Sequence, residues 1–370
     1  MRRLVGRHVR ELQVYRRLSK PTHNLRKAVA FLSESISGWS GELRSIALEP
    51  HLAKFGWRLI SVPPTLSLSQ RRRIIGFDKP DLILLQQSRH PLNRPALYGD
   101  IPVIFDADDA DILDPRCADT VIDCCRGSVS IIAGSRFLRD QFRVHNPNVA
   151  IIWTSTYVDH VDKPIPADQR GPVLTWAHSG PLDYIEEAQF VRDVTLQLAR
   201  RTTFSFRLYG VGENRKHEAD DYLEPMRKMG VSVQTFPQMS YRSFVQSLST
   251  AAVGLHPVCT ATNPFSQGKS FGKLLAYLAA DVSIVTSHAV DHPLFFQDDV
   301  NGMLVANDVD KWVERCERLI TLPDLRRKLA GAARLDFLRR LTSARAAELV
   351  AGQFDKAMHI SRTSSAALQP

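Results

Sequence analysis

Short apolar runs alternate along the chain with stretches that have the 3.6-residue period of helices. Residues 42–56, for example, have helical period and lie between two apolar runs. Runs of six to eight apolar residues bounded by turns predict buried strands, and strands that alternate with helices predict a parallel sheet. In the first half the runs are 28–33, 57–64, 80–87, 101–108, 129–135 and 149–156.

This alternation stops at residues 162–172, a polar and proline-rich stretch that we interpret as an interdomain linker. A second series follows, so the predicted fold class is α/β, with doubly wound domains over 28–165 and 166–341. Two such domains facing each other predict a ligand cleft at the carboxyl ends of their strands. The later strands are expected at 173–180, 204–213, 231–238, 251–258, 281–288 and 302–308, and helices at 185–200, 309–321, 324–333 and 342–360.

Positive charge is concentrated at the start of the chain. Of the net charge of +9, residues 1–27 supply +8, with nine Lys or Arg against one acid, Glu11. The remainder is near neutral, so we expect no binding to nucleic acid. Apolar residues at helical spacing predict a basic amphipathic helix, which suits an anionic membrane surface, docking on its own domain, or a frayed tail. These apolar residues are Leu4, Val5, Val9, Leu12, Tyr15 and Leu18.

Cysteine usage and hydropathy suggest where the protein is located. The five cysteines show no CxxC spacing, which favours a reduced compartment and makes a zinc site unexpected. No run approaches the roughly 18 apolar residues of a membrane span, and the N-terminus lacks the apolar centre of a secretory signal. We therefore expect a cytoplasmic protein, peripheral on the inner face of the membrane if residues 1–27 bind lipid.

Four aspartates crowd the end of one predicted strand, in the stretch VIFDADDAD. Two unit charges about 6 Å apart repel by roughly 3 kcal/mol at an effective dielectric near 20. Because ligands bind at the carboxyl ends of parallel strands, the crowding predicts a functional loop. The four are Asp106, Asp108, Asp109 and Asp111.

Four interpretations of this stretch remain open. A haloacid-dehalogenase-like phosphatase would use Asp106 as nucleophile and Asp108 as acid, but Ala110 replaces the usual Thr or Val. The same two aspartates spell the DxD metal motif of single-domain sugar transferases, which is short and frequent by chance. A third interpretation is a metal-free loop that hydrogen-bonds substrate hydroxyls. The fourth is capping of the next helix by Asp108, Asp109 or Asp111, which we favour for the last two.

A second informative stretch is NPFSQGKSFGKLLAYLAAD, residues 263–281. It nearly spells a P-loop but lacks the first glycine and a strand leading into it, so a nucleoside-triphosphate hydrolase is not expected. Gly268 permits close approach of a ligand, and Ser270 is expected to cap the following helix. With Lys269 and Lys273, this helix terminus predicts a diphosphate site; the alternative is a capped surface helix that carries lysines.

Two glycine-containing turns follow the first predicted strand of each domain. In the second domain, TWAHSGPLDY places His178 and Ser179 at the cleft, where a single histidine is equally well explained as structural. In the first domain, SGWSGELR places Gly41 after the strand and Arg44 in the first helical turn. Both turns are therefore candidates for the ligand site.

Together these stretches resemble the GT-B glycosyltransferases, and within them glycosyltransferase family 4, from about residue 28 to 360. Their order and spacing carry the resemblance more than any one segment. The family's first loop and helix resemble SGELRSIALEPHLAKFGW, and the YDxDDA segment of a bacterial subgroup resembles VIFDADDAD. The vxasSxxlxxxl segment resembles IIAGSRFLRDQF, the viPNgVD segment resembles IIWTSTYVD, and the lxixGxG turn resembles FRLYGVGE. The donor-binding helix and the turn after it resemble NPFSQGKSFGKLLAYLAADVSIVTS and DDVNGMLV.

The resemblance implies a nucleotide-sugar donor held mainly by the second domain. Gly268, Lys269, Ser270 and Lys273 would lie at the diphosphate, and the turn with His178 and Ser179 would lie beside the donor. The sugar would be transferred with retention, and no metal or other cofactor would be required.

The first domain would hold the acceptor, a glycan or a lipid-linked sugar. Asp106 and Asp108 are then the candidate catalytic residues that position the acceptor or the donor sugar, and Gly41 and Arg44 form an acceptor-side loop. A C-terminal helix within residues 342–370 would cross back to the first domain. The expected pathway is synthesis of cell-surface polysaccharide or glycoconjugate.

One departure from the family pattern affects the donor site. Members commonly carry two glutamates eight positions apart around this helix, and here those positions hold Gly268 and Ala276. Each charge-assisted hydrogen bond from such a carboxylate is worth roughly 1.5–3 kcal/mol. The sequence therefore leaves an alternative function open, a catalytically inactive relative that binds a ligand or scaffolds a partner.

Overall fold

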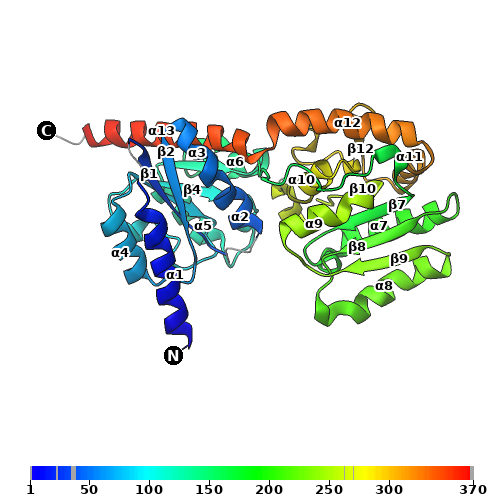
Figure 1. Ribbon diagram of the computed structural model, residues 1–370, viewed down its shortest axis with the longest axis horizontal. Helices are drawn as coiled ribbons and strands as arrows, with labels where there is room; N and C mark the ends of the chain where they lie inside the picture. The colour runs from blue at the N-terminus through cyan, green and yellow to red at the C-terminus, as the bar shows by residue number, and fades with distance from the viewer. Residues whose placement is uncertain (1, 22–23, 35–38, 262, 270, 367–370) are drawn as a thin grey trace. The chain divides into compact units, whose positions relative to one another are not determined.

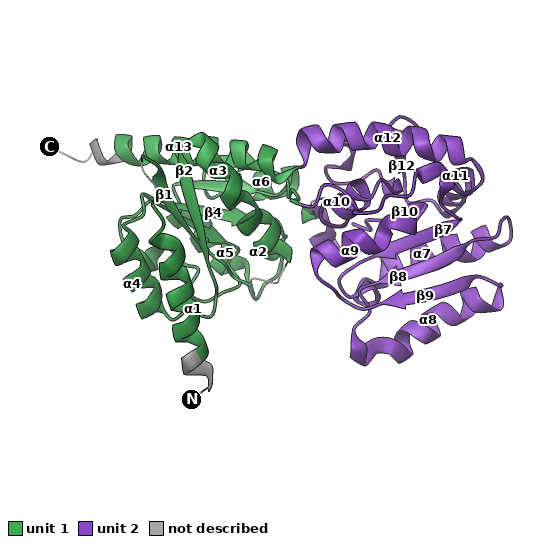
Figure 2. Cartoon of the chain, viewed as in Figure 1, with its two compact units in different colours: residues 1–157, 268–270, 342–370 green, residues 158–267, 271–341 purple. Residues whose placement is uncertain are grey.

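The computed structural model describes residues 2–21, 24–34, 39–261, 263–269 and 271–366. The chain forms two compact units (Figure 2), of which unit 1 holds residues 1–157, 268–270 and 342–370, and unit 2 holds residues 158–267 and 271–341. Both are α/β units, and each is described by itself.

Unit 1 is built on a parallel sheet of six strands, which confirms the six predicted from the apolar runs (Figure 1). The strand order β2-β1-β3-β4-β5-β6 places the point where the winding direction reverses between β1 and β3. In sheets of this kind, ligands bind outside the carboxyl ends of the strands at that point. The strands are β1 Arg26–Phe31, β2 Trp57–Val62, β3 Leu82–Gln86, β4 Val103–Ala107, β5 Ser130–Ala133 and β6 Val149–Ile151.

The helix expected over 42–56 is broken into short pieces. Pro50 lies in the first turn of α3, where it cannot donate a backbone hydrogen bond, so α3 does not continue the preceding turns. Gly56, at φ 80°, ends the last turn in the left-handed conformation that glycine favours. The pieces are α2 Trp39–Arg44, a 3-10 turn at Ile46–Leu48, α3 Glu49–Leu52 and a 3-10 turn at Ala53–Phe55; the other helices of unit 1 that follow are α4 Leu68–Asp78, α5 Ala118–Gly127 and α6 Arg136–Arg143.

The last helix, α13 (Ser343–Ala366), packs in unit 1 although it is the end of the chain. Phe354 packs edge-on against Trp57, with ring centroids 5.1 Å apart. The indole Nε1 of Trp57 donates to Asp355 Oδ1 at 2.8 Å. Ala347 is fully buried in the same hydrophobic cluster as strands β1, β2 and β3, so α13 completes the core of unit 1.

The basic helix predicted near the N-terminus is α1 (Arg2–Leu18), and it docks on unit 1. Val14 and Leu18 are buried. Arg17 pairs with Glu49 of α3 and donates to the Ser61 carbonyl at 3.0 Å. The alternative of docking on its own domain therefore holds for this helix.

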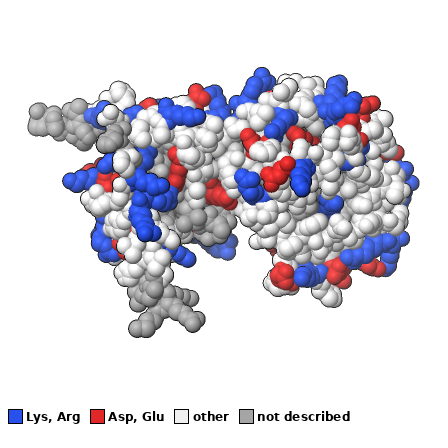
Figure 3. All heavy atoms as spheres, in the orientation of Figure 1, with Lys and Arg blue, Asp and Glu red and all other residues white. Residues whose placement is uncertain are grey.

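The opposite face of α1 is exposed. Val9 and Leu12 are 48% and 63% exposed, and the exposed Arg10 and Arg16 lie on the same helix. Figure 3 shows Lys and Arg side chains gathered around α1. Among the described residues, no helix is long and apolar enough to cross a bilayer. Binding to an anionic membrane surface stays a prediction.

Unit 2 also contains six parallel strands, in the order β12-β11-β10-β7-β8-β9 (Figure 1). Its core includes Trp176 of β7 and Trp312 of α11, both almost completely buried. The strands are β7 Val173–Ala177, β8 Ser205–Tyr209, β9 Ser232–Phe236, β10 Val253–His256, β11 Ser283–Ser287 and β12 Met303–Val305; the helices are α7 Ile185–Ala199, α8 Lys216–Lys228, α9 Tyr241–Ser247, α10 Gly272–Ala279, α11 Val309–Thr321 and α12 Pro323–Arg340.

The change from unit 1 to unit 2 lies at Tyr157–Val158, eight residues before the predicted boundary at 165–166. Residues that precede the proline-rich stretch already pack in unit 2. Val161 is buried there, and the backbone N–H of Asp162 donates to Gln246 Oε1 at 2.8 Å. The amino-acid composition predicts the polar linker, but it does not predict these contacts with unit 2.

Candidate functional site

The four aspartates lie at one edge of the unit 1 sheet. Asp106 is in β4, in register with Gln86 of β3, and the other three follow the end of β4. On the other side, β5 ends at Ala133, so the loops after β3, β4 and β5 meet at this edge. The structure therefore places the stretch at the carboxyl end of a buried strand, as its pattern predicts.

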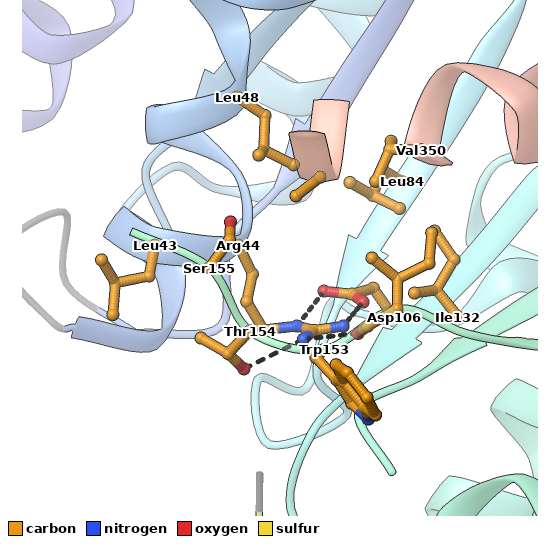
Figure 4. A pocket seen from close by; sticks show the side chains of 12 residues that line it. Leu43, Arg44, Leu48, Leu84, Asp106, Ile132, Trp153, Thr154, Ser155 and Val350 are labelled. Atoms are coloured by element: carbon orange, nitrogen blue, oxygen red, sulfur yellow. Dashed lines mark hydrogen bonds and ion pairs between the residues drawn. The ribbon is translucent and has the colours of Figure 1, made fainter. Parts of the chain in front are cut away.

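Asp106 forms a buried ion pair with Arg44 of α2 (Figure 4). The two side chains are 3% and 4% exposed. Arg44 Nε donates to Asp106 Oδ2 at 3.0 Å, and Nη2 donates to Oδ1. Arg44 Nη1 donates to the Ile152 carbonyl at 3.2 Å and to Thr154 Oγ1 at 3.1 Å. Burial lowers the pKa of Arg44, but the carboxylates of Asp106, Asp108 and Asp109 together outweigh burial, so the net shift is upward and the guanidinium stays charged. Burial also raises the pKa of Asp106, and the charge of Arg44 opposes that rise.

The carboxylate of Asp108 accepts hydrogen bonds from three separate segments of unit 1. Its Oδ1 accepts from Ser40 Oγ at 3.2 Å and from Gln87 Nε2 at 2.7 Å. Its Oδ2 accepts from Thr154 Oγ1 at 2.9 Å and lies 4.0 Å from Arg44 Nε. Asp108 therefore links the start of α2 with the loops after β3 and β6.

Two residues that the sequence did not single out support this arrangement. A Cβ at Gly134 would lie 2.5 Å from the Cβ of Asp108, so only glycine permits the approach of the β5 loop. Gln87 adopts φ 60°, a conformation unusual for a residue with a side chain, and this directs its amide to Asp108. The AGS sequence after β5 contains a visible glycine signal, whereas Gln87 has none.

The capping predicted for this stretch is wrong. The 3-10 turn Asp111–Leu113 and the helix α5 both begin without a side-chain cap. Asp109 and Asp111 instead accept from Arg89, whose Nη2 lies 2.7 and 2.8 Å from their carboxylates. A guanidinium compensates the two negative charges more effectively than a helix terminus would, because it carries a full positive charge.

The pKa of Asp109 is raised. Burial and repulsion from Asp108 and Asp111 together bring it to about 6, against the opposing charge of Arg89. Asp109 therefore changes charge close to neutral pH, which an ordinary aspartate does not.

The space next to the Arg44–Asp106 pair is small. Figure 4 shows it between Leu43, Leu48, Leu84 and Val350, with Arg44 and Asp106 at its floor. Its volume of about 10 Å³ is that of one water molecule. The pair is thus part of a packed support and does not line a sugar-sized cavity within unit 1.

The geometry bears on the two metal-dependent interpretations. Both oxygens of Asp106 accept hydrogen bonds from a buried arginine, which opposes nucleophilic attack by Asp106 and its use as a metal ligand. Across the described ranges, no three His, Cys, Asp or Glu side chains group closely enough to hold a metal ion. A loop that presents hydrogen-bonding groups to substrate hydroxyls stays a prediction.

In unit 2, His178 and Ser179 follow β7, at the carboxyl edge of that sheet. The ring of His178 lies 3.8 Å from that of Tyr184, between centroids, and its Nδ1 lies 3.2 Å from the Ser179 carbonyl oxygen. A Cβ at Gly210, which has φ 91°, would lie 1.7 Å from the His178 carbonyl oxygen. The turn after β7 thus requires glycine in the turn after β8.

The candidate diphosphate residues surround the start of α10. The helix begins at Gly272, after Phe271, which makes no side-chain cap. Ser270, the predicted cap, lies outside the described residues. Gly268 and Lys269 group with unit 1 and Lys273 with unit 2, so the diphosphate site stays a prediction.

Comparison with known proteins gives the family and the fold. Residues 189–351 match the family model described as glycosyl transferase-like, and no curated protein matches the chain. A glycosyltransferase from Rickettsia africae is 11% identical, with a TM-score of 0.66 over 91% of this chain and 99% of that one. Alr3699/HepE from Anabaena, solved with UDP and glucose, is 12% identical, with a TM-score of 0.62 over 89% and 99%. The sucrose-phosphate synthase of Thermosynechococcus elongatus is 10% identical, with a TM-score of 0.66 over 90% and 99%.

The chain has the GT-B glycosyltransferase fold. The predicted α/β class and the resemblance are confirmed, and the matching family model confirms the enzyme class, glycosyltransferase. The match spans most of unit 2 and the first turns of α13.

In this chain, α10 differs from the pattern of the family that the sequence resembles, and the structure shows where the difference lies. Ala276, at a position where a donor-binding glutamate is usual, is fully buried in unit 2. A glutamate there would have to place its charge in the apolar core.

Proposed function

We propose that this chain is a retaining, metal-independent glycosyltransferase that moves a sugar from a nucleotide-sugar to a glycan or lipid-linked acceptor. The observation that carries the proposal is the match of residues 189–351 to the glycosyl transferase-like family model, because it includes the segment 268–273. Solved structures of the same fold include Alr3699/HepE with UDP and with UDP-glucose.

On the donor side, the proposal assigns the diphosphate to Lys269, Ser270 and Lys273. The first turn of α10 carries no acidic residue, so the positive end of its dipole and the lysines together favour a diphosphate. As the bond to the sugar breaks, negative charge grows on the diphosphate, and these groups stabilise it electrostatically. His178 and Ser179 would border the same ligand.

On the acceptor side, Asp108 is the best-placed carboxylate. Asp106 holds Arg44, and this pair supports Thr154, which donates to Asp108. We assign Asp108 to a hydroxyl of the acceptor or the donor sugar, and Asp106 to positioning. No side chain is assigned as general base, because in a retaining reaction the departing phosphate can accept the proton of the acceptor.

Replacement of Lys273 with Ala tests the donor site. We expect the affinity for the bound nucleotide to fall at least tenfold, because a charge-assisted hydrogen bond is worth about 1.5–3 kcal/mol. Isothermal titration calorimetry with UDP, GDP and ADP, and with their sugars, identifies the nucleotide and measures the change. Lys228→Ala is a matched control on the exposed end of α8, 75% exposed. Equal affinity in the wild type and K273A would remove Lys273 from the site.

A second candidate function is a catalytically inactive relative that binds or scaffolds. The observation that favours it is the pair Gly268 and Ala276, with Ala276 buried where a carboxylate is usual. Slow hydrolysis of a nucleotide-sugar without acceptor distinguishes the two. An active transferase is expected to release nucleotide, and an inactive relative is not.

We also propose that the protein is cytoplasmic and reaches the inner face of the membrane through residues 1–27. The support is the outward face of α1, with Val9, Leu12 and Arg16. Synthesis of cell-surface polysaccharide or glycoconjugate would suit that location. Co-sedimentation with phosphatidylglycerol vesicles, and loss of it in Leu12→Glu, tests the surface.

A further inference from the structure

Unit 1 contains a second pocket, separate from the aspartate edge. Ser33 follows β1, Thr65 follows β2 and His90 follows β3, and all three line it. It therefore lies at the carboxyl ends of the strands on either side of the reversal between β1 and β3, where this kind of sheet binds ligands. Its volume, about 610 Å³, lies within the range of small-molecule sites. We call it the β1–β3 pocket.

A buried arginine behind this pocket has no carboxylate partner. Arg71 of α4 is fully buried. Its Nη1 donates to Asn93 Oδ1 and Tyr98 Oη, each at 2.9 Å, and its Nη2 lies 3.3 Å from His90 Nδ1. Within the described part of the chain, neutral groups alone accept from it, and its Nε has no acceptor. Burial accordingly lowers its pKa, the opposite of the shift of Arg44.

His90, which separates Arg71 from the pocket, does not neutralise this charge. Its Nδ1 accepts from the backbone N–H of Leu92 at 3.1 Å and faces Arg71. Burial, with the positive charges of Arg71 and Arg94, lowers the pKa of His90 to about 4. The wall of the pocket is thus the neutral imidazole of His90, and behind it lies the guanidinium of Arg71, which has no carboxylate partner among the described residues.

The entrance adds positive charge and no negative charge. Arg7 of α1 lines it, and no Asp or Glu does so among the described residues. Ser67 also lines it and caps α4, which has no acidic residue in its first turn. The positive end of the α4 dipole therefore faces the same space.

The walls between these groups are apolar. Leu66, Leu68 and Leu92 line the pocket, together with two prolines. The hydroxyl of Thr65, which also lines it, is buried without a hydrogen-bond partner. The pocket therefore combines a positive end, an unused hydroxyl and a hydrocarbon-like wall.

A purely structural role for Arg71 would resemble that of Arg326 in unit 2. There, every nitrogen of the guanidinium donates to backbone carbonyls, which carry the negative ends of peptide dipoles. Arg71 differs, because its Nε has no acceptor and most of its partners are side chains. Its guanidinium lies over the ring of Phe31, with Cζ 4.7 Å from the ring centroid, and no carboxylate among the described residues neutralises its charge.

We infer that the β1–β3 pocket binds an alkyl phosphate monoester, with the phosphate toward Arg7 and the start of α4 and the hydrocarbon against the leucines. The inference rests on the proposed function, since it identifies the acceptor as one that carries a lipid phosphate. Arg71 acts from behind the wall through its field and makes no contact with the ligand.

Octyl phosphate is the probe, and octanol and inorganic phosphate are the controls for its two ends. Calorimetry on the full chain without nucleotide is expected to show octyl phosphate binding at least tenfold tighter than either control. Because no donor is present, this result does not depend on transferase activity, and loss of transferase activity would leave it unchanged. Equal binding of octyl phosphate and octanol would overturn the inference.

Ser67→Asp is the sharpest variant. Aspartate caps a helix as well as serine does, so α4 is retained while a negative charge enters the pocket. We expect octyl phosphate affinity to fall at least tenfold. Ser240→Asp, at the matching cap of α9 in unit 2, is the control that leaves binding unchanged. Unchanged binding in S67D would place the phosphate elsewhere and overturn the inference.

Arg7→Glu, with Arg10→Glu on the same helix as control, separates a pocket ligand from a bilayer headgroup. The inference predicts that Arg7→Glu weakens octyl phosphate at least tenfold and Arg10→Glu leaves it unchanged. Phosphatidylglycerol vesicles distinguish the source, since a surface effect weakens vesicle binding equally in both variants. Equal loss of octyl phosphate in both variants would show general charge attraction and overturn the pocket.

Discussion

One buried arginine in each unit, Arg44 in unit 1 and Arg326 in unit 2, is held by a different kind of partner. In unit 1, Arg44 is held by the carboxylate of Asp106 at the carboxyl edge of the sheet. In unit 2, Arg326 donates to carbonyls at the end of α11 and in the segment that enters the unit, among them Ile320 and Ala167. One arrangement neutralises a full charge, and the other neutralises the ends of peptide dipoles.

This difference predicts that mutations of the two arginines have different effects. The carboxylate-held arginine lies at the carboxyl edge of its sheet, where sheets of this kind bind ligands, and shares Thr154 with the partly exposed Asp108. The carbonyl-held arginine ties residues 167–170 to unit 2, which fixes the chain where it enters that unit. A mutation in the first should therefore change chemistry and stability together, and one in the second should change stability alone.

The largest effect is expected for Asp106→Asn. It leaves Arg44 buried without its counter-charge, which costs about 3–5 kcal/mol of unfolding free energy. Urea denaturation measures the loss, and transfer activity should fall with it. The double replacement Arg44→Met with Asp106→Leu should recover most of the stability but not the activity. A stable D106N variant would show that the pair does not support unit 1.

Arg326→Met should follow, at about 2–4 kcal/mol, because several buried carbonyls lose charged donors. Denaturation measures this, and nucleotide affinity should stay at the wild-type value. A change in affinity without a change in stability would reverse the contrast between the units.

Asp109→Asn tests the electrostatic environment of the aspartates in unit 1. The pKa of Asp109 is about 6 in the folded protein against 3.8 in the unfolded chain, so the folded state binds more protons between these values. Stability should therefore fall as pH rises from about 4 to 6, by about 1–2 kcal/mol after allowance for partial exposure. The variant should lack this fall, so its stability relative to wild type rises with pH. A constant difference from pH 4 to 7 would contradict the shift.

The smallest effect belongs to an exposed pair on α13. Arg345 contacts Glu348 one turn along the helix, and both are about half exposed. Arg345→Ala should change the unfolding free energy by less than about 0.5 kcal/mol. Thermal denaturation at low and high salt checks this, and a larger loss would mean that burial alone does not decide which arginines matter.

Periodicity predicted the elements of the fold well. In the described part of the chain, all twelve strands overlap predicted runs, and most of these strands are buried and largely apolar, as expected of parallel strands covered on both faces. The exception is the edge strand β9, which is largely exposed. The prediction of one helix over 42–56 was wrong because Pro50 interrupts it. That prediction gave more weight to the helical period than to this proline. Element type is encoded locally, and so the sequence alone was enough.

Side-chain pairing was not predictable in the same way. Arg44 and Asp106 were both candidates, but they are 62 residues apart, and only the sheet brings them together. The expected caps at Asp109 and Asp111 were wrong because Arg89, from the neighbouring loop, competes for the same oxygens. Gln87 was missed because its role depends on a backbone turn that its residue type does not reveal.

The position of α13 has a consequence for the order in which the protein is made. Phe354 and Ala347 fill the core under strands that end 200 residues earlier, at Ile151. A ribosome must therefore finish nearly the whole chain before the first domain can close, while the second already has almost all of its residues. The domain that begins first is the one that matures last, and nascent chains stopped near residue 341 should expose its apolar face to chaperones.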